Sequence, residues 1–220
     1  MTEAEEWAVA TEQKLLDRTL KLAPVHGWTW KTARLAGKAE GLSAGEVELL
    51  LPHGPADLAA LLSRRHDQRT MTILKEVDPQ GLKIRERIRA GCEARLDAAA
   101  TDEPALRRWM GFLALPPHLG LAGRLAWESA DALWRWAGDV AVDENHYSKR
   151  ALLAGILSGA MAIRMSSGRK AALDFTDRRI ADVMAFEKWK GTSGLRPGDW
   201  LAAAAQKLGR ARYGASVDPS

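Results

Sequence analysis

The chain of 220 residues is long enough for one large domain or for a small domain joined to a larger one, and its 46% hydrophobic and 27% charged residues exclude a largely disordered protein. Its net charge of +4 is modest, so the placement of the charges must decide between a nucleic acid, an anionic membrane and neither as a partner. The single cysteine, Cys92, excludes an intramolecular disulfide, is typical of a reducing compartment and, among helix-forming neighbours, is expected to be a small core residue.

Residues 1–56 predict three short helices. The first covers residues 5–23, where leucines supply an apolar side and Pro24 is expected to end the helix. The second and third cover residues 30–40 and 46–51, with a Gly-Leu-Ser turn between them. This arrangement is typical of a helix-turn-helix, so we expect a head of that type.

A DNA-reading helix in this head would need Arg, Lys, Asn or Gln side chains directed at bases and phosphates. The third helix instead carries Glu46 and Glu48, and carboxylates repel a polyanion. Lys31, Arg34 and Lys38 on the preceding helix compensate only in part. We therefore predict a degenerate head that does not read DNA, which a mobility-shift assay with genomic fragments would test.

From residue 57 onward the sequence shows no alternation with period two, so the predicted fold class is all-α. We expect a helical body over residues 57–190, a glycine-bearing linker over 191–198, and an amphipathic C-terminal helix and tail over 199–220. Glycine, proline and acidic turns delimit helices at about residues 57–75, 81–100, 103–114, 120–137, 145–165, 171–190 and 198–213.

The helix at residues 120–137 is apolar over most of its circumference, so it is either buried or covered by an apolar ligand or partner. Gly138 is expected to close it in the left-handed conformation, and Asp143 is expected to cap the helix that follows. Its one narrow polar stripe consists of Arg124, Glu128, Asp131 and Arg135.

Residues 151–163 form a nearly unbroken apolar run, ALLAGILSGAMAI, which is too short to span a bilayer. Small residues recur along it at helical spacing, and they permit either close helix packing, as in a dimer seam, or a ligand between helices. The residues alone favour packing. A ligand would lie against Leu152, Ile156, Met161 and Met165, with Trp109, Met110 and Phe112 opposite.

The last predicted helix carries Trp200, Leu201 and Leu208 on one apolar face, with Lys207 beside that face and Arg210 opposite. Such a helix either docks on the body or lies on an anionic membrane, and the residues alone leave the two alternatives about even. Liposome binding by a Trp200→Ala variant would separate them.

The motifs of several enzyme classes are absent from the sequence. The five histidines are scattered without the spacing of a metal face, and no paired E-x-x-H motif of a di-iron bundle occurs. There is no Walker loop, dinucleotide fingerprint or G-x-S-x-G elbow. We therefore expect no catalytic residues, no metal and no cofactor.

Four ordered motifs carry a resemblance to a known family. They are K-I-R-E-R-I at residues 83–88, F-L-A-L-P at 112–116, D-x-L-W-x-x-A-G-D-x-x-x-D-x-N-x-Y-x-K-R at 131–150, and D-R-R-I-A-D-V-M-x-F-E-K at 177–188. Over about residues 15–190 the chain resembles the coenzyme Q biosynthesis accessory family. The resemblance implies a TetR-like fold, binding of an isoprenoid lipid, and support of the di-iron hydroxylase that modifies a ubiquinone precursor.

The resemblance also implies functional residues. It favours a lipid pocket lined by Trp109, Met110, Phe112, Leu125, Leu152, Ile156, Met161 and Met165. It places the hydroxylase contact on Asp131, Leu133, Trp134, His146, Tyr147 and Arg150, although relatives usually have Trp where this chain has His146. Alternatively, Leu133 and Trp134 belong to the core and Tyr147 only caps its helix. The membrane contact implied for the last helix comprises Trp200, Leu201, Lys207, Leu208 and Arg210.

We therefore expect a homodimeric, non-enzymatic accessory protein that holds an isoprenoid quinone or another lipid and presents it to the hydroxylase. The acidic start, MTEAEEWAVA, lacks the layout of a secretory signal or a mitochondrial presequence, so the chain looks like a bacterial, cytoplasmic member that is peripheral on the inner membrane. The alternative is a TetR-type transcriptional repressor with an apolar effector pocket. A third alternative is a structural dimer without a ligand.

Overall fold

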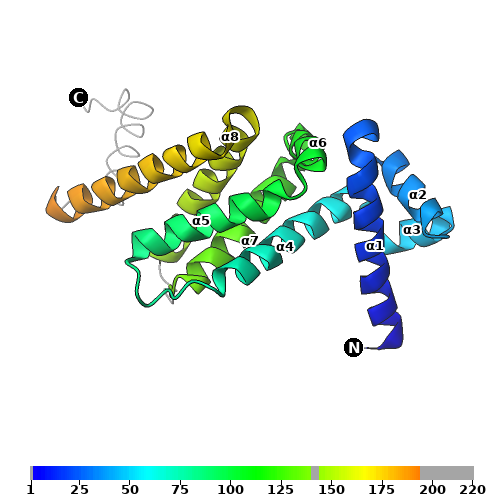
Figure 1. Cartoon of the computed structure of the whole chain (residues 1–220), viewed down its shortest axis with the longest axis horizontal. Coiled ribbons are helices and arrows are strands. Elements are labelled where there is room, and N and C mark those ends of the chain that lie inside the picture. Colours follow the sequence, from blue (N-terminus) through cyan, green and yellow to red (C-terminus); the bar gives the residue numbers. More distant parts are fainter. Residues whose placement is uncertain (1, 140–143, 194–220) are drawn as a thin grey trace, which may run out of the picture. The chain divides into compact units, whose positions relative to one another are not determined.

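The computed structural model describes residues 2–139 and 144–193, and every regular element within these ranges is a helix (Figure 1). The all-α prediction is therefore confirmed for this part of the chain. The predicted C-terminal helix with Trp200, Leu201, Lys207, Leu208 and Arg210, and the predicted cap Asp143, lie outside the described residues. The elements are α1 (Glu3–His26), α2 (Trp30–Ala39), α3 (Ala44–Leu50), α4 (Pro55–Leu74), α5 (Ile84–Ala100), α6 (Glu103–Leu113), a short 3-10 helix η1 (Pro116–His118), α7 (Leu119–Trp136) and α8 (Glu144–Ser193).

The end of α1 differs from the prediction, because Pro24 lies inside the helix and does not terminate it. Proline removes one N–H donor, and in the last turn the loss of one hydrogen bond is tolerated. The helix ends instead at Gly27, which has a φ of 74° and donates its N–H to the carbonyl of Ala23 at 2.8 Å. A left-handed φ of this kind is readily adopted only by glycine.

The short helices α2 and α3 pack against each other and α2 packs against α1 (Figure 1). A side chain at Gly37 of α2 would overlap that of Val47 in α3, so this glycine permits the close approach of the two helices. Ser43 caps α3, and the Glu46 carboxylate accepts the Ser43 N–H at 2.8 Å in return. Helix α2 ends one residue before its predicted end and α3 begins two residues before its predicted start, while the helix-turn-helix assignment stays a prediction.

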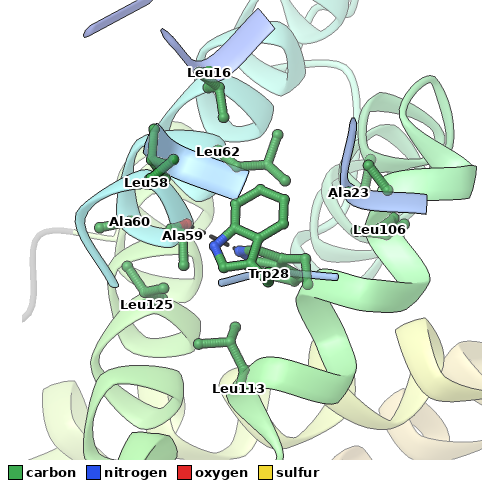
Figure 2. Packing of buried hydrophobic residues seen from close by; sticks show 14 of the residues in the cluster. Leu16, Ala23, Trp28, Leu58, Ala59, Ala60, Leu62, Leu106, Leu113 and Leu125 are labelled. Carbon is green, nitrogen blue, oxygen red and sulfur yellow. Dashed lines mark hydrogen bonds between the residues drawn. The ribbon is translucent and has the colours of Figure 1, made fainter. Parts of the chain in front are cut away.

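The main core lies where α1, α4, α6 and α7 meet. Buried side chains from these helices converge on one apolar cluster, which includes Leu16, Leu58, Leu106 and Leu125 (Figure 2). Burying one such leucine contributes about 1.5–3 kcal/mol. Cys92 of α5 is also fully buried, as predicted, and burial followed by the nearby Asp177 carboxylate raises the pKa of its thiol to about 12.

Helices α4, α5 and α7 lie side by side and form the body on which the cavity described below is built (Figure 1). The chain divides into two units, Met1–Asp177 and Arg178–Ser220, and the cavity and the side-chain clusters described below lie within the first. Within that unit α8 is interrupted at Gly168, whose φ of 86° and ψ of 177° are not helical. The predicted break between residues 165 and 171 is therefore confirmed.

Among the described helices, the segment His146–Ala185 of α8 is long and apolar enough to cross a membrane, with a mean hydropathy of 1.3. The prediction rejected a span because the run 151–163 is too short, whereas the helix continues beyond both ends of that run. The criterion concerns length and composition only. Apolar helices packed in the core of a soluble protein meet it as well, and 22% of the relevant window is buried within the protein.

Candidate functional site

A cavity of about 250 Å³ lies between α6, α7 and α8, with one end reaching α4 and α5. The sequence predicted a cavity between the first three of these helices. Its lining consists of Trp109, Met110, Leu113 and Ala114 from α6 and its C-terminal end, Leu119, Ala122, Leu125, Ala126 and Ser129 from α7, Leu157, Ser158 and Met161 from α8, Ser63 from α4, and Arg95 from α5.

Helix α7 lines the cavity with five residues, which follow one another at intervals of one or three positions and share one face. From Leu119 to Ser129 the helix advances about 15 Å at 1.5 Å per residue. Leu119 is 57% exposed, whereas Ser129 is buried, so the cavity opens at the first residue and closes at the second. Between them Ala122 and Ala126 have small side chains and leave the space that a ligand would fill.

The closed end of the cavity is polar. Arg95 is only 6% exposed, and its Nε donates to Asp67 Oδ1 at 2.7 Å. The hydroxyl of Ser129 donates to the same carboxylate oxygen at 2.7 Å, and Ser63 Oγ lies 3.5 Å from Arg95 Nη2. These groups form one network that joins α4, α5 and α7 below an otherwise apolar cavity.

A second polar pair lies next to Trp109. His66 is buried with its ring at an edge-on angle to the indole, and its Nε2 lies 3.0 Å from Asp102 Oδ2. Burial lowers the pKa of His66 to about 4 against the opposing hydrogen bond to Asp102, so the imidazole is neutral near pH 7. Trp109 itself is fixed by donation of its indole N–H to the carbonyl of Ala59 at 3.0 Å.

Four of the eight predicted pocket residues line the cavity: Trp109, Met110, Leu125 and Met161. The other four do not, and their assignment to its lining is corrected here. Phe112 stacks on His118 at a centroid distance of 3.9 Å, Leu152 is 47% exposed, Ile156 is buried away from the cavity, and Met165 lies one turn beyond Met161.

The sequence missed two kinds of lining residue. Leu157 and Ser158 of α8 face the cavity, but a run that is apolar all around its circumference does not indicate which face is turned inward. Arg95 and Ser63 carry no sequence signal, because both residue types are usually exposed. For α7 a sequence signal was available, because Leu119, Ala122, Ala126 and Ser129 recur at helical spacing and so mark the face that lines the cavity.

The small residues of α8 serve packing as well as the cavity. At Gly159 an added Cβ would lie 2.9 Å from the ring of Phe175, so the missing side chain admits this ring from beyond the interruption at Gly168. Ser158, the preceding residue, lines the cavity. The packing interpretation is therefore confirmed at Gly159, while the ligand interpretation stays a prediction for the cavity beside Ser158.

The junction of α7 and α8 holds a buried charge cluster. The side chain of Arg150 is 2% exposed and forms ion pairs with Asp131 at 2.5 Å and Asp139 at 3.1 Å. Gly138 closes α7 with a φ of 88°, donating its N–H to Arg135 O at 3.0 Å, which confirms the predicted C-cap. Because Asp139 follows this turn directly, the cap places its carboxylate beside Arg150.

Two of the residues predicted to contact the hydroxylase are therefore inaccessible. Leu133 is buried against Gly91 of α5, where an added Cβ would lie 3.0 Å from the leucine side chain. Arg150 is buried in the ion-pair cluster. Their assignment to a partner surface is wrong, because packing and charge pairing occupy both side chains; for Leu133 the core alternative is confirmed.

Of the remaining residues of this set, Asp131 is mostly buried and paired with Arg135 and Arg150, and the others leave an aromatic surface. Tyr147 is 66% exposed, and its ring lies 6.1 Å from that of Trp127 and 5.2 Å from that of His146. Trp134 is half-buried and donates its indole N–H to the carbonyl of Lys149 at 3.1 Å, with Lys149 Nζ 5.5 Å from the ring centroid. We call Trp127, Trp134, His146, Tyr147 and Lys149 the aromatic patch.

Within the N-terminal helices, the surface that a DNA-reading head would turn toward DNA contains an internal ion pair. Arg34 of α2 donates to Glu48 of α3 at 2.8 Å, so this cation is neutralised by the adjacent helix. A hydrogen bond from Ser43 lowers the pKa of Glu46, which keeps that carboxylate charged. Across the residues that the structure covers, no group of three or more His, Cys, Asp or Glu could hold a metal ion.

Together, the described helices and the apolar cavity with its polar closed end define an all-helical protein with a ligand-sized cavity. A family model described as COQ9 matches residues 119–187, which include the cavity-lining face of α7 and the junction with α8. The match supports the family resemblance carried by the four sequence motifs.

Curated relatives extend the similarity to most of the chain. The chain is 26% identical to the mitochondrial ubiquinone biosynthesis protein COQ9 of Bos taurus over 185 residues, which are 79% of this chain and 57% of the bovine protein. It is 27% identical to the same protein of Rattus norvegicus, over 79% of this chain and 58% of that protein. A probable mitochondrial ubiquinone biosynthesis protein of Dictyostelium discoideum is 23% identical over 89% of this chain and 66% of its own length. The chain thus spans less than two thirds of the length of the curated relatives it matches.

Proposed function

We propose that this protein acts in ubiquinone biosynthesis as a lipid-binding accessory protein, which holds an isoprenoid quinone intermediate and presents it to a di-iron hydroxylase. The observation that carries the proposal is the cavity of about 250 Å³ along α7, within the segment that matches the COQ9 family model. The ion pair between Arg34 and Glu48 fits the same proposal, because it neutralises a cation that a DNA-reading head would need. We therefore propose that α1 to α3 form a TetR-like head that no longer reads DNA. The relatives, which are ubiquinone biosynthesis proteins, indicate the pathway.

The size of the cavity limits what it holds. An apolar cavity of about 150 Å³ admits benzene, so this one accommodates a substituted ring or a short part of a tail. Each methylene moved from an apolar environment into water costs about 0.8 kcal/mol, so the rest of a long tail must remain covered by protein or bilayer. The exposed Leu115 and Leu119 at the open end supply apolar surface where such a tail would leave the cavity.

Filling the cavity should abolish lipid binding. Ala126 lies midway along the lining face of α7, and an Ala126→Phe variant would place a ring in the ligand space. We expect a co-purifying lipid in the wild-type protein and at least a tenfold loss of it in the variant, measured by native mass spectrometry and organic extraction. Ala10→Phe, on an exposed position of α1, is the matched control and should retain the lipid. Equal lipid content in Ala126→Phe and wild type, or no lipid in the wild type, would contradict the proposal.

The aromatic patch is the surface that we propose for the hydroxylase. Exposed aromatic residues beside a cation are typical of interface hot spots, which contribute about 2 kcal/mol or more each. Tyr147→Ala should therefore weaken hydroxylase binding at least tenfold in a titration, while the melting temperature stays close to that of the wild type because the ring is mostly exposed. Trp7→Ala, which removes an exposed aromatic from α1, serves as control. Lower stability with unchanged binding would instead assign Tyr147 to a structural role.

A further inference from the structure

We infer that the closed end of the cavity recognises an uncharged oxygen acceptor, such as a ring-bound carbonyl group, through the guanidinium of Arg95, so that the ligand enters with its polar end first. The inference rests on the proposed lipid-binding function and deepens it by naming the chemistry of the ligand's polar group. It follows from the hydrogen bonding, the charge and the shape of the closed end.

Arg95 has a donor without a partner. Its Nε is taken by Asp67 at 2.7 Å and its Nη2 lies 3.5 Å from Ser63 Oγ, but no acceptor among the described residues pairs with its buried Nη1. Leaving a buried donor unpaired is unfavourable, and hydrogen bonds to charged groups are stronger than those between neutral ones. Because Arg95 lines the cavity, a ligand that brings an acceptor to this end gains that bond.

The charges around this donor already balance. Arg95 pairs with Asp67, and Arg69 pairs with Asp102 at 2.6 Å. His66, which contacts Asp102, is neutral near pH 7 because burial lowers the pKa of its imidazole to about 4. A carboxylate on the ligand would add an unbalanced negative charge next to Asp67 in a buried site, which is unfavourable. A neutral carbonyl oxygen accepts the bond without adding charge.

The shape of the cavity fits a flat head followed by a narrow chain. Between the two ends, Ala122 and Ala126 leave space in a cavity that the indole of Trp109 also lines, and aromatic rings favour stacked or edge-on contacts with such a partner. At the open end, Leu119 is exposed, so an apolar chain attached to the ring leaves the protein there. The polar group thus lies about 15 Å inside, at the level of Ser129.

Three probes of nearly identical shape test the inference: para-octylacetophenone, para-octylbenzoate and para-octylcumene. Their heads present a neutral carbonyl, a carboxylate and no oxygen acceptor, respectively, on the same octylphenyl body. Near neutral pH we expect the acetophenone to bind roughly ten- to one-hundredfold more tightly than the cumene, as one hydrogen bond to a charged donor predicts, and more tightly than the benzoate. Quenching of tryptophan fluorescence reports binding, because Trp109 lines the cavity.

Each outcome of this comparison has a distinct meaning. Equal binding of the acetophenone and the cumene overturns the role of Arg95 but leaves the lipid cavity intact. Tightest binding of the benzoate overturns the preference for a neutral head. Binding of none of the three, with the protein folded, overturns the proposed function together with the inference.

A double variant then assigns the preference to Arg95. Arg95→Met with Asp67→Leu removes both members of the ion pair, so neither charge is left buried alone. We expect it to bind the cumene as well as the wild type does and to lose the preference for the acetophenone. Arg95→Lys keeps a positive charge for Asp67 but has a single side-chain nitrogen, so none is left for the ligand. This variant should reduce the preference for the acetophenone with the least disturbance to folding. An unchanged preference in whichever of these variants is folded by circular dichroism contradicts the inference.

Discussion

Replacing Arg150 with methionine should lower the free energy of unfolding by up to about 3–5 kcal/mol, because it removes the buried cation that two carboxylates share. The Arg150 side chain is 2% exposed and pairs with both Asp131 and Asp139. Asp139 keeps a second partner, Lys149 at 2.9 Å, and Asp131 keeps Arg135, but both of those cations are more exposed than Arg150. Urea denaturation followed by circular dichroism measures the loss.

Arg169→Met is the matched control for this change. Arg169 also pairs with two carboxylates, Glu93 at 2.6 Å and Asp97 at 2.8 Å, but its side chain is about half exposed. Exposed ion pairs contribute about 0–1 kcal/mol, so the control should lose at most that. Equal losses in the two variants would show that the cluster at the α7–α8 junction is not buried in solution.

The same cluster predicts a pH dependence. Burial raises the pKa of the Asp131 and Asp139 carboxyls, but hydrogen bonds and charge from Arg150 and their second cations outweigh it and lower both pKa values below the usual range. A carboxyl with a lowered folded-state pKa contributes stability above its unfolded pKa of about 3.9, and this contribution is lost as the pH falls through the folded value. The difference between wild type and Arg150→Met should therefore shrink below about pH 4.

The Gly54→Ala substitution should also lower the free energy of unfolding by a large amount. Gly54 precedes α4 with a φ of 59° and a ψ of −124°, a conformation essentially restricted to glycine, and strain of this kind costs about 1–3 kcal/mol. In addition, a Cβ at this position would overlap ring carbons of Trp30, and overpacking adds about 1–3 kcal/mol. We expect a total of about 2–6 kcal/mol, measured by thermal and urea unfolding.

Gly123→Ala provides a control of opposite sign. Gly123 lies within α7, and an added Cβ there meets no atom within 4 Å. Alanine is favoured over glycine in a helix by about 0.5–1 kcal/mol, so this variant should be more stable than the wild type. A Gly54→Ala protein that unfolds like the wild type would mean that the turn before α4 differs from the structure described here.

Local signals in the sequence were sufficient for most of the helices and for several of their ends. Gly138 has the positive φ predicted for it, and α2 and α3 lie within two residues of their predicted bounds, because caps and turns depend on neighbouring residues. Pro24 misled the prediction, since one missing hydrogen bond does not end a helix that Gly27 can close three residues later.

The candidate site was only partly predictable, because it depends on which helices meet. Trp109 and Met161 could be placed by size and apolarity, but Leu152 was assigned to the wrong side of a helix that is apolar all around. Arg95 and Arg150 read as surface cations in the sequence, and they become buried only because carboxylates from distant positions meet them. Pairing over such distances leaves no periodic trace in a single sequence.

The way α7 is held has a mechanical consequence. At its C-terminal end Leu133 is pressed against Gly91 and Asp131 is tied to the buried Arg150, while at its N-terminal end Leu119 is exposed and follows a short 3-10 turn. The helix is thus held more firmly beside the polar end of the cavity than at its mouth. Bending of α7 at its N-terminal end would widen the mouth of the cavity for chains of different thickness and leave the distance between Ser129 and Arg95 unchanged. Amide hydrogen exchange along α7 should then be faster at the N-terminal end than at the C-terminal end.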